Sequence, residues 1–173
     1  MRYTQAIREK RDRFQAYREA GVVSTHDRCI VALNSGGLWP HVEGVGLPRV
    51  LSAVFPIGNE RVTLDAKTGK VLRIDHEYRG EILRANGAEI PLTAFLDPEY
   101  AQISGIICDS ARVTGWRQQG NQRFVSTNNP TATTPLPLGF FGLGTEFRSE
   151  RNGDGFTLKR HERKISGVPV GAG

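Results

Sequence analysis

The chain opens with apolar side chains at helical spacing. On a helix these residues fall within one stripe that can face a core; they are Tyr3, Ile7, Phe14 and Tyr17, with Lys10 interrupting the stripe. Gly21 follows the last of them, at the position where a left-handed residue without a side chain commonly ends a helix. We therefore predict one long amphipathic helix that starts at Arg2 and stops at Gly21.

Two later segments are apolar at almost every position. Residues 29–33 read Cys-Ile-Val-Ala-Leu, and residues 103–108 read Ile-Ser-Gly-Ile-Ile-Cys. The first run is apolar at every position, which is typical of a strand covered on both faces. We expect the two segments to pair as central strands of a sheet, with Gly105 marking a close approach by another backbone.

Between these runs, the polarity pattern predicts two hairpins. Residues 61–65 alternate like a half-buried strand, 67–69 supply turn residues, and 71–74 form the returning strand. The second hairpin joins 82–84 to 90–92 through Asn86-Gly87, and Pro91 confines its last strand to an edge.

The C-terminal part is rich in proline, threonine and glycine from residue 128 onwards, and we expect it to be long and irregular. Together these patterns predict an α/β or α+β fold, in which the N-terminal helix packs on a mixed sheet. We expect a single domain over residues 1–165 and a flexible tail over 166–173.

Composition narrows the class of protein. A length of 173 residues suits one domain, and no apolar run approaches the length that crosses a bilayer, so we expect a cytoplasmic protein without membrane contact. A formal charge of +5 and a pI near 9.6 favour polyanionic partners. Cys29 and Cys108 lie inside the apolar runs, which suits small buried side chains rather than a disulfide or a zinc site.

A polar row flanks the apolar stripe of the predicted helix. Its members share one face and could grip a phosphate backbone; they are Arg8, Arg11, Gln15 and Arg18. The competing interpretation is a solvated helix flank, in which Arg8 forms an ordinary pair with Asp12 one turn away.

The compact catalytic pattern in the chain is an acidic residue, any residue and a lysine. It occurs at Asp65-Ala66-Lys67 and at Glu162-Arg163-Lys164. In metal-dependent nucleases the carboxylate helps bind Mg²⁺ and the lysine stabilises developing charge. A pattern of three residues also arises by chance, so neither site is assigned as catalytic, and no cofactor is indicated unless a nuclease site requires Mg²⁺.

Two further candidates for catalysis are His41, in a glycine-rich stretch, and the run Asp75-His76-Glu77. No carboxylate or nucleophile is fixed beside His41 by the sequence. Adjacent residues on a strand point to opposite faces, so the second set favours a solvated surface over a metal site.

One family resemblance is carried by the order of several segments. The chain resembles the later half of restriction-endonuclease-like proteins of the PD-(D/E)XK class in its Phe14-Gln15-Ala16-Tyr17 helix, the strand 29–34, the strand 103–107, Asn129-Pro130 and Pro135-Leu136-Pro137. In that family an acidic strand pair precedes the helix and binds the metal. Here the strands that would carry it are expected upstream of Met1.

The resemblance implies a DNA-associated, noncatalytic remnant or companion of a nuclease, with duplex DNA as the partner and Arg11 and Gln15 nearest a phosphate. The alternative is a noncatalytic α+β module that uses the loops 38–46 and 127–138 to bind a protein partner or a small ligand. DNA binding across salt concentrations discriminates between the two.

Overall fold

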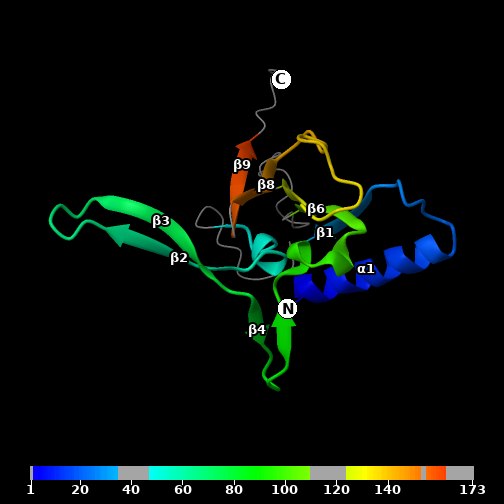
Figure 1. Ribbon diagram of the computed structural model, residues 1–173, viewed down its shortest axis with the longest axis horizontal. Coiled ribbons are helices and arrows are strands. Elements are labelled where there is room, and N and C mark those ends of the chain that lie inside the picture. Colours follow the sequence, from blue (N-terminus) through cyan, green and yellow to red (C-terminus); the bar gives the residue numbers. More distant parts are fainter. Residues whose placement is uncertain (1, 35–46, 110–123, 153–154, 163–173) are drawn as a thin grey trace, which may run out of the picture.

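Helix α1, Arg2–Glu19, lies across one face of a five-stranded mixed sheet (Figure 1). The computed structural model describes residues 2–34, 47–109, 124–152 and 155–162. The strands of the sheet are β1 (Cys29–Asn34), β6 (Ile103–Asp109), β7 (Phe124–Asn128), β8 (Thr145–Asn152) and β9 (Gly155–Glu162), hydrogen-bonded in the order β1-β6-β7-β8-β9. The fold is therefore α+β, as predicted.

The predicted pairing of the two apolar runs is confirmed. Strand β1 runs parallel to β6, with Val31 opposite Ile106, and β6 continues the sheet through antiparallel β7. Strand β1 stands at one end of the described sheet, so its cover is one-sided: Val31 is buried, whereas Ala32 is exposed. The expectation that this strand is covered on both faces is therefore wrong, whereas its partner β6 is buried along most of its length.

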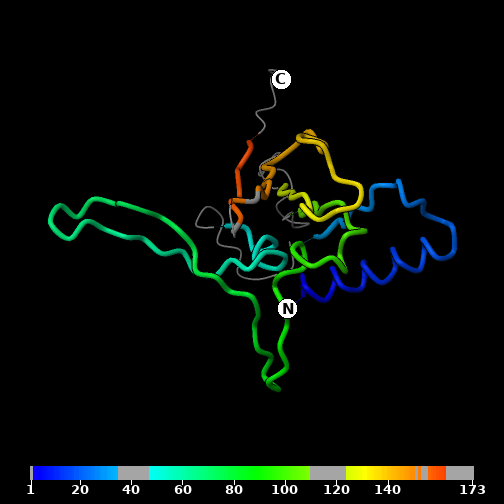
Figure 2. The backbone as a smooth tube through the Cα atoms, in the orientation of Figure 1, coloured from blue at the N-terminus to red at the C-terminus, as the bar shows by residue number. Residues whose placement is uncertain are grey.

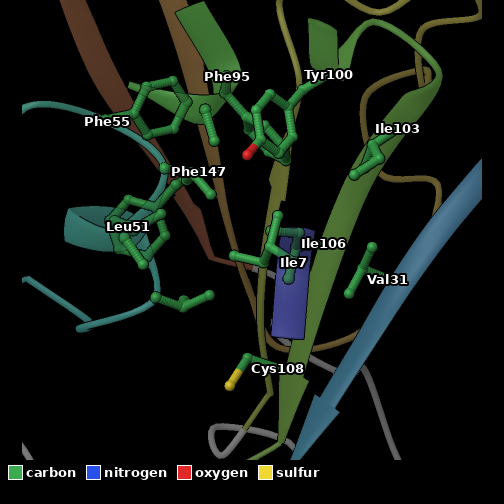
Figure 3. Close-up of a cluster of buried hydrophobic side chains, with 14 of the residues drawn as sticks. Ile7, Val31, Leu51, Phe55, Phe95, Tyr100, Ile103, Ile106, Cys108 and Phe147 are labelled. Carbon is green, nitrogen blue, oxygen red and sulfur yellow. The ribbon is translucent and has the colours of Figure 1, made fainter. Parts of the chain in front are cut away.

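The core lies between the sheet and a layer formed by α1 and short connecting helices. Ile7 of α1, Val31 and Ile106 come together on one side of the sheet, beside Phe55 and Phe95 (Figure 3). The short 3₁₀ helices that supply the rest of this layer are η1 (Leu51–Ala53), η2 (Ala94–Leu96) and η3 (Pro98–Tyr100).

Helix α1 ends as its sequence predicts. Gly21 has a φ of +69°, and its N–H donates to the carbonyl of Arg18 at 3.0 Å. Such a left-handed residue is the common helix stop, and glycine adopts it without steric cost. The predicted apolar stripe is shorter than expected, because Tyr17 is 44% exposed and only Ile7 is fully buried.

The C-terminal region is only partly irregular. Residues 145–152 and 155–162 form an antiparallel pair, β8 and β9, which corrects the expectation of a long irregular C-terminal region. These two strands contain few large apolar side chains. Phe147 is buried, and Leu158 is partly buried against the core. The segment 129–144 between β7 and β8 is irregular, as expected, and residues 163–173, including the predicted tail, lie outside the described residues.

Asn129 anchors that irregular segment to the sheet. Its side chain is fully buried, and Nδ2 donates to the carbonyls of Tyr100 and Ile103, both at 2.9 Å. Its Oδ1 accepts from the N–H and the hydroxyl of Thr131 at 3.0 and 2.8 Å. The Asn-Pro element quoted for the family resemblance therefore has a structural role here.

The segment then crosses the second face of the sheet. Leu136 is buried against Gly105, where an added Cβ would lie 2.6 Å from the Leu136 side chain. The partly buried Arg148–Glu146 pair, at 2.9 Å, holds the segment in place because Arg148 also donates to the Leu136 carbonyl at 2.6 Å. The same Cβ would lie 2.6 Å from the carbonyl oxygen of Thr127, so the close backbone approach predicted at Gly105 is confirmed.

Both predicted hairpins are present and project from the body (Figures 1 and 2). The larger one consists of β2 (Ile57–Leu64) and β3 (Val71–Tyr78), and the smaller one of β4 (Glu81–Leu83) and β5 (Glu89–Pro91). Each is a two-stranded sheet of its own among the described residues. We refer to residues 57–78 as the arm.

Candidate functional site

The arm is attached to the core only at its base. Phe55 and Ile57 are buried, and the N–H of Arg79 donates to the carbonyl of Pro56 at 2.9 Å. Beyond Ile57, no arm residue belongs to the hydrophobic core of the described residues. Strands β2 and β3 therefore extend away from the body as a twisted ribbon (Figure 2).

One face of the arm is apolar over its outer part. Val62 lies directly opposite Ile74 in the hairpin register, and Leu64 lies opposite Val71. Residues directly opposite each other share a face, and the two-residue period of a strand adds Leu72. We call the set Val62, Leu64, Val71, Leu72 and Ile74 the apolar face. The next pair towards the base, Glu60 opposite His76, lies on the same side and is polar.

These side chains are unusually exposed for their type. Val62 and Leu64 are 50% and 54% exposed, Leu72 and Ile74 are 64% and 59%, and Val71 is 56%. The other large apolar side chains on the described surface occur mainly as single residues or sequence neighbours on separate elements, such as Val22 and Leu83. Contiguous apolar patches, unlike single residues, mark interaction sites on folded proteins.

The opposite face of the arm is ionic. Arg61 lies across from Asp75 and donates to its carboxylate at 3.0 Å, and Arg73 donates to the same carboxylate at 2.8 Å. Exposed pairs of this kind contribute little to stability individually. They make this side of the arm polar, whereas the other side carries the apolar face. This arrangement is typical of an antiparallel sheet that has one face packed against other protein and one face in water.

The turn of the arm is fixed by Asp65. Its Oδ1 accepts from the Thr68 N–H and hydroxyl at 2.7 and 2.8 Å, and from the Lys67 N–H at 3.0 Å. These hydrogen bonds, chiefly those from Thr68, lower the pKa of the Asp65 carboxyl below its ordinary value of 3.8. The acidic-x-Lys pattern at this position thus coincides with a turn in which the carboxylate already has its donors.

The remaining candidates for catalysis do not converge on one site. Glu162 is paired with Arg160 at 2.5 Å, and its partner in the motif, Lys164, lies outside the described residues, as does His41. Asp75 is occupied by its two arginines, and Glu77 is exposed. Among the described residues, no group of three His, Cys, Asp or Glu side chains is arranged to hold a metal ion.

A second surface feature is a cleft of about 240 Å³ beside α1. It lies between the helix and the segment that follows β5, and a smaller hollow continues it towards the β4–β5 hairpin. Arg8 lines both parts, and Arg84 lines the smaller one. The cleft also contains Asp97 and Glu99, so its charge is mixed.

The predicted arginine row is only partly available for a ligand. Arg11 donates to Glu99 and Asp12, both at 2.8 Å, and its guanidinium lies 4.9 Å from the centre of the Tyr100 ring. These partners, with the Asp12 hydrogen bond the largest contribution, raise the pKa of Arg11. The expected pair of Arg8 with Asp12 is replaced by this one.

The other members of the row have separate surroundings. Gln15 donates to Glu19 at 3.0 Å. Arg18 is partly buried, and its Nε and one terminal nitrogen have no hydrogen-bond partner among the described residues. Arg8 is exposed and forms no ion pair with a described residue. The four side chains therefore do not form one uniform cationic surface.

Sequence reasoning missed the arm as a surface. The alternation at 61–65 and 71–74 was present and predicted the hairpin correctly, but it predicted half-buried strands, whereas the apolar side chains are half or more exposed. Alternation shows that one face of a strand is apolar. It does not show whether another part of the same chain covers that face.

Comparison with family models, with curated proteins and with solved structures finds no match to this chain. The resemblance to the PD-(D/E)XK class therefore stays a prediction. No helix among the described residues is long and apolar enough to span a membrane.

Proposed function

We propose that the chain is a noncatalytic protein-interaction module whose contact element is the apolar face of the arm. The single observation that carries the proposal is that five large apolar side chains share one face of a projecting hairpin, each at least half exposed. A two-stranded hairpin is marginally stable by itself in water, so a partner that covers this face would also stabilise the arm.

The energetics specify the kind of partner. Full burial of a large apolar side chain contributes roughly 1.5–3 kcal/mol, so covering the exposed half of five contributes on the order of 4–8 kcal/mol. Association costs about 4–15 kcal/mol in lost freedom of motion. The arm alone offsets only the lower part of that cost, so the partner must present an apolar surface of its own.

Photo-cross-linking tests this proposal in intact cells. A photoactivatable phenylalanine derivative replaces Leu72 on the arm in one variant and Leu83 on β4 in the other. The two positions are matched, because both leucines are 64% exposed and both lie on projecting hairpins. We expect a discrete cross-linked protein product from position 72, identified by mass spectrometry, and little product from position 83.

A charge-bearing variant completes the design. Val62→Glu together with Ile74→Glu should abolish the product from position 72, since two carboxylates would have to be desolvated in the contact. Equal cross-linking from positions 72 and 83, or a product that survives the double substitution, would contradict the proposal.

DNA association is a second candidate function, as a noncatalytic remnant or companion of a PD-(D/E)XK protein. The observation that favours it is that Arg8 and Arg84 line the same hollow beside α1, and neither forms an ion pair with a described residue. Two unpaired guanidinium groups at one groove suit phosphate contacts. Arg11 and Gln15, bonded to neighbouring acids, are less suited than predicted.

The salt dependence of duplex DNA binding tests this candidate. If Arg8 and Arg84 each contact a phosphate, their joint replacement by alanine should reduce the slope of log K against log salt by about 2, near 0.9 per contact. Lys67→Ala with Lys70→Ala, at the arm turn, is the charge-matched control. Absence of binding at low salt, or an equal change in the control, would exclude the candidate.

A further inference from the structure

We propose that the partner of the arm is a second copy of this chain, bound face to face through the apolar faces of the two arms. This inference rests on the proposed function, because it names the occupant of the same surface. It requires that two identical faces provide enough area, that their charges are compatible, and that the rest of the two chains can be accommodated.

The area is sufficient. With exposures between 50% and 64%, the five side chains of the apolar face present roughly 500 Å² of accessible surface. That value is within the range of the largest patch on a typical monomer. Two such faces brought together would bury about 1,000 Å², which is the least that a biological interface is expected to bury. A small partner surface would fall short of it, whereas an identical arm reaches it.

The charges of the arm are balanced. Residues 57–78 contain four basic side chains, Arg61, Lys67, Lys70 and Arg73, and four acidic ones, Glu60, Asp65, Asp75 and Glu77. The arm is therefore neutral with His76 uncharged, and the whole excess of +5 belongs to the remainder of the chain. A neutral face does not repel its own copy, and it offers no attraction to a polyanion.

The length of the arm keeps the two basic bodies apart. Strands β2 and β3 contain eight residues each, and a strand rises about 3.3 Å per residue, so the arm reaches about 26 Å. If two arms overlap antiparallel, the bodies lie about one arm length apart. That distance exceeds the Debye length of about 8 Å at physiological ionic strength, so the repulsion between the bodies is screened.

The geometry fixes which residues meet. In an isologous contact, if one residue of the first copy touches a second residue of the other, the reverse contact also occurs. Val62 and Ile74 form the end of the apolar face towards the base, and Leu64, Val71 and Leu72 form the end towards the turn. A two-fold axis between these two ends places Leu72 of each copy near Ile74 of the other.

Sedimentation of the whole purified chain over a range of concentrations tests the proposal. We expect a reversible monomer–dimer equilibrium, and Val62→Glu with Ile74→Glu should raise its dissociation constant by about 30-fold or more. The double variant Leu83→Glu with Val22→Glu is the control, because it places the same two charges at positions outside the arm that are at least as exposed. Circular dichroism should show that all variants stay folded, since none of these side chains belongs to the core.

A second measurement does not depend on a substitution that adds charge. Isotopically labelled and unlabelled chains, both carrying the photo-cross-linker in place of Leu72, are mixed and irradiated. We expect mixed-isotope dimers whose cross-linked peptides join position 72 to the region of Ile74. Cross-links confined to one chain would overturn the proposal even if the charged variant failed to fold.

The outcomes separate this inference from the function on which it rests. A chain that stays monomeric at its highest attainable concentration, or a dimer that the arm variant leaves intact, overturns the second-copy proposal. If the arm nevertheless cross-links to a different protein in cells, the interaction function stands and only the identity of the partner is wrong. If the arm forms no cross-link in either setting, both proposals fail.

Discussion

Replacement of Asn129 by alanine should destabilise the chain more than its small change in volume suggests. The Asn129 side chain is fully buried and donates to two backbone carbonyls, those of Tyr100 and Ile103, at 2.9 Å each. Alanine leaves both acceptors without their donor, and a buried polar group that loses its partner costs about 1–3 kcal/mol. We therefore expect the free energy of unfolding to fall by about 2–5 kcal/mol.

Urea unfolding followed by circular dichroism measures this change, and Asn86→Ala is the matched control. Asn86 is exposed, and its side chain accepts one hydrogen bond from the N–H of Ala88 at 3.2 Å, so its loss should cost less than about 1 kcal/mol. Asn129→Asp adds a discriminating variant, because a carboxylate keeps the acceptor for Thr131 but cannot donate to the two carbonyls. If Asn129→Ala costs no more than Asn86→Ala, the anchoring role assigned to Asn129 is wrong.

Three further predictions address other parts of the fold. Gly105→Ala should lower the free energy of unfolding in urea by about 1–3 kcal/mol, because its Cβ would lie 2.6 Å from both Leu136 and the Thr127 carbonyl. Leu136→Ala in the same chain should relieve only part of that cost, and full relief would show that the backbone contact is unimportant. Ile7→Ala, at 1% exposure, should cost about 2–5 kcal/mol, whereas Tyr17→Ala should cost under about 1 kcal/mol; equal costs would contradict the packing assigned to α1. Because the pKa of Asp65 is depressed in the folded chain, its stabilisation of the turn is complete above pH 3.8 and is lost as the pH falls through the folded value. An NMR titration of the Asp65 carboxyl should show this, with Thr68→Val moving the pKa back towards 3.8, and an unchanged pKa in that variant would refute the assignment.

Local signals in the sequence were sufficient for the elements that depend on local physics. Gly21 ends α1 as predicted, and the turn residues at 67–69 and 86–87 place both hairpins correctly. The two apolar runs also predicted their own pairing, because burial on a shared core face leaves few alternatives for such segments.

Features that depend on contacts between distant segments could not be predicted from local sequence patterns. Strands β8 and β9 are polar along most of their length, and Phe147 alone does not distinguish a strand from a loop in the sequence. Arg11 is paired with Glu99, which lies 88 residues away, so no helix-based pattern could reveal that the predicted phosphate-binding row is interrupted. The arm is exposed because no other segment of the described fold packs on its apolar face, and a local sequence pattern does not reveal this.

Hydroxyl-radical footprinting is the measurement that tests the role of the arm most directly. The labelling of Leu64, Leu72 and Ile74 is compared between the purified chain at high dilution and the chain in intact cells, with Leu83 and Val22 as internal references of similar exposure. We expect the arm residues to be labelled strongly in dilution and to become protected in cells, while the references do not change. Equal labelling of the arm in both settings would show that nothing covers the apolar face in cells, and the proposed role of the arm would be wrong.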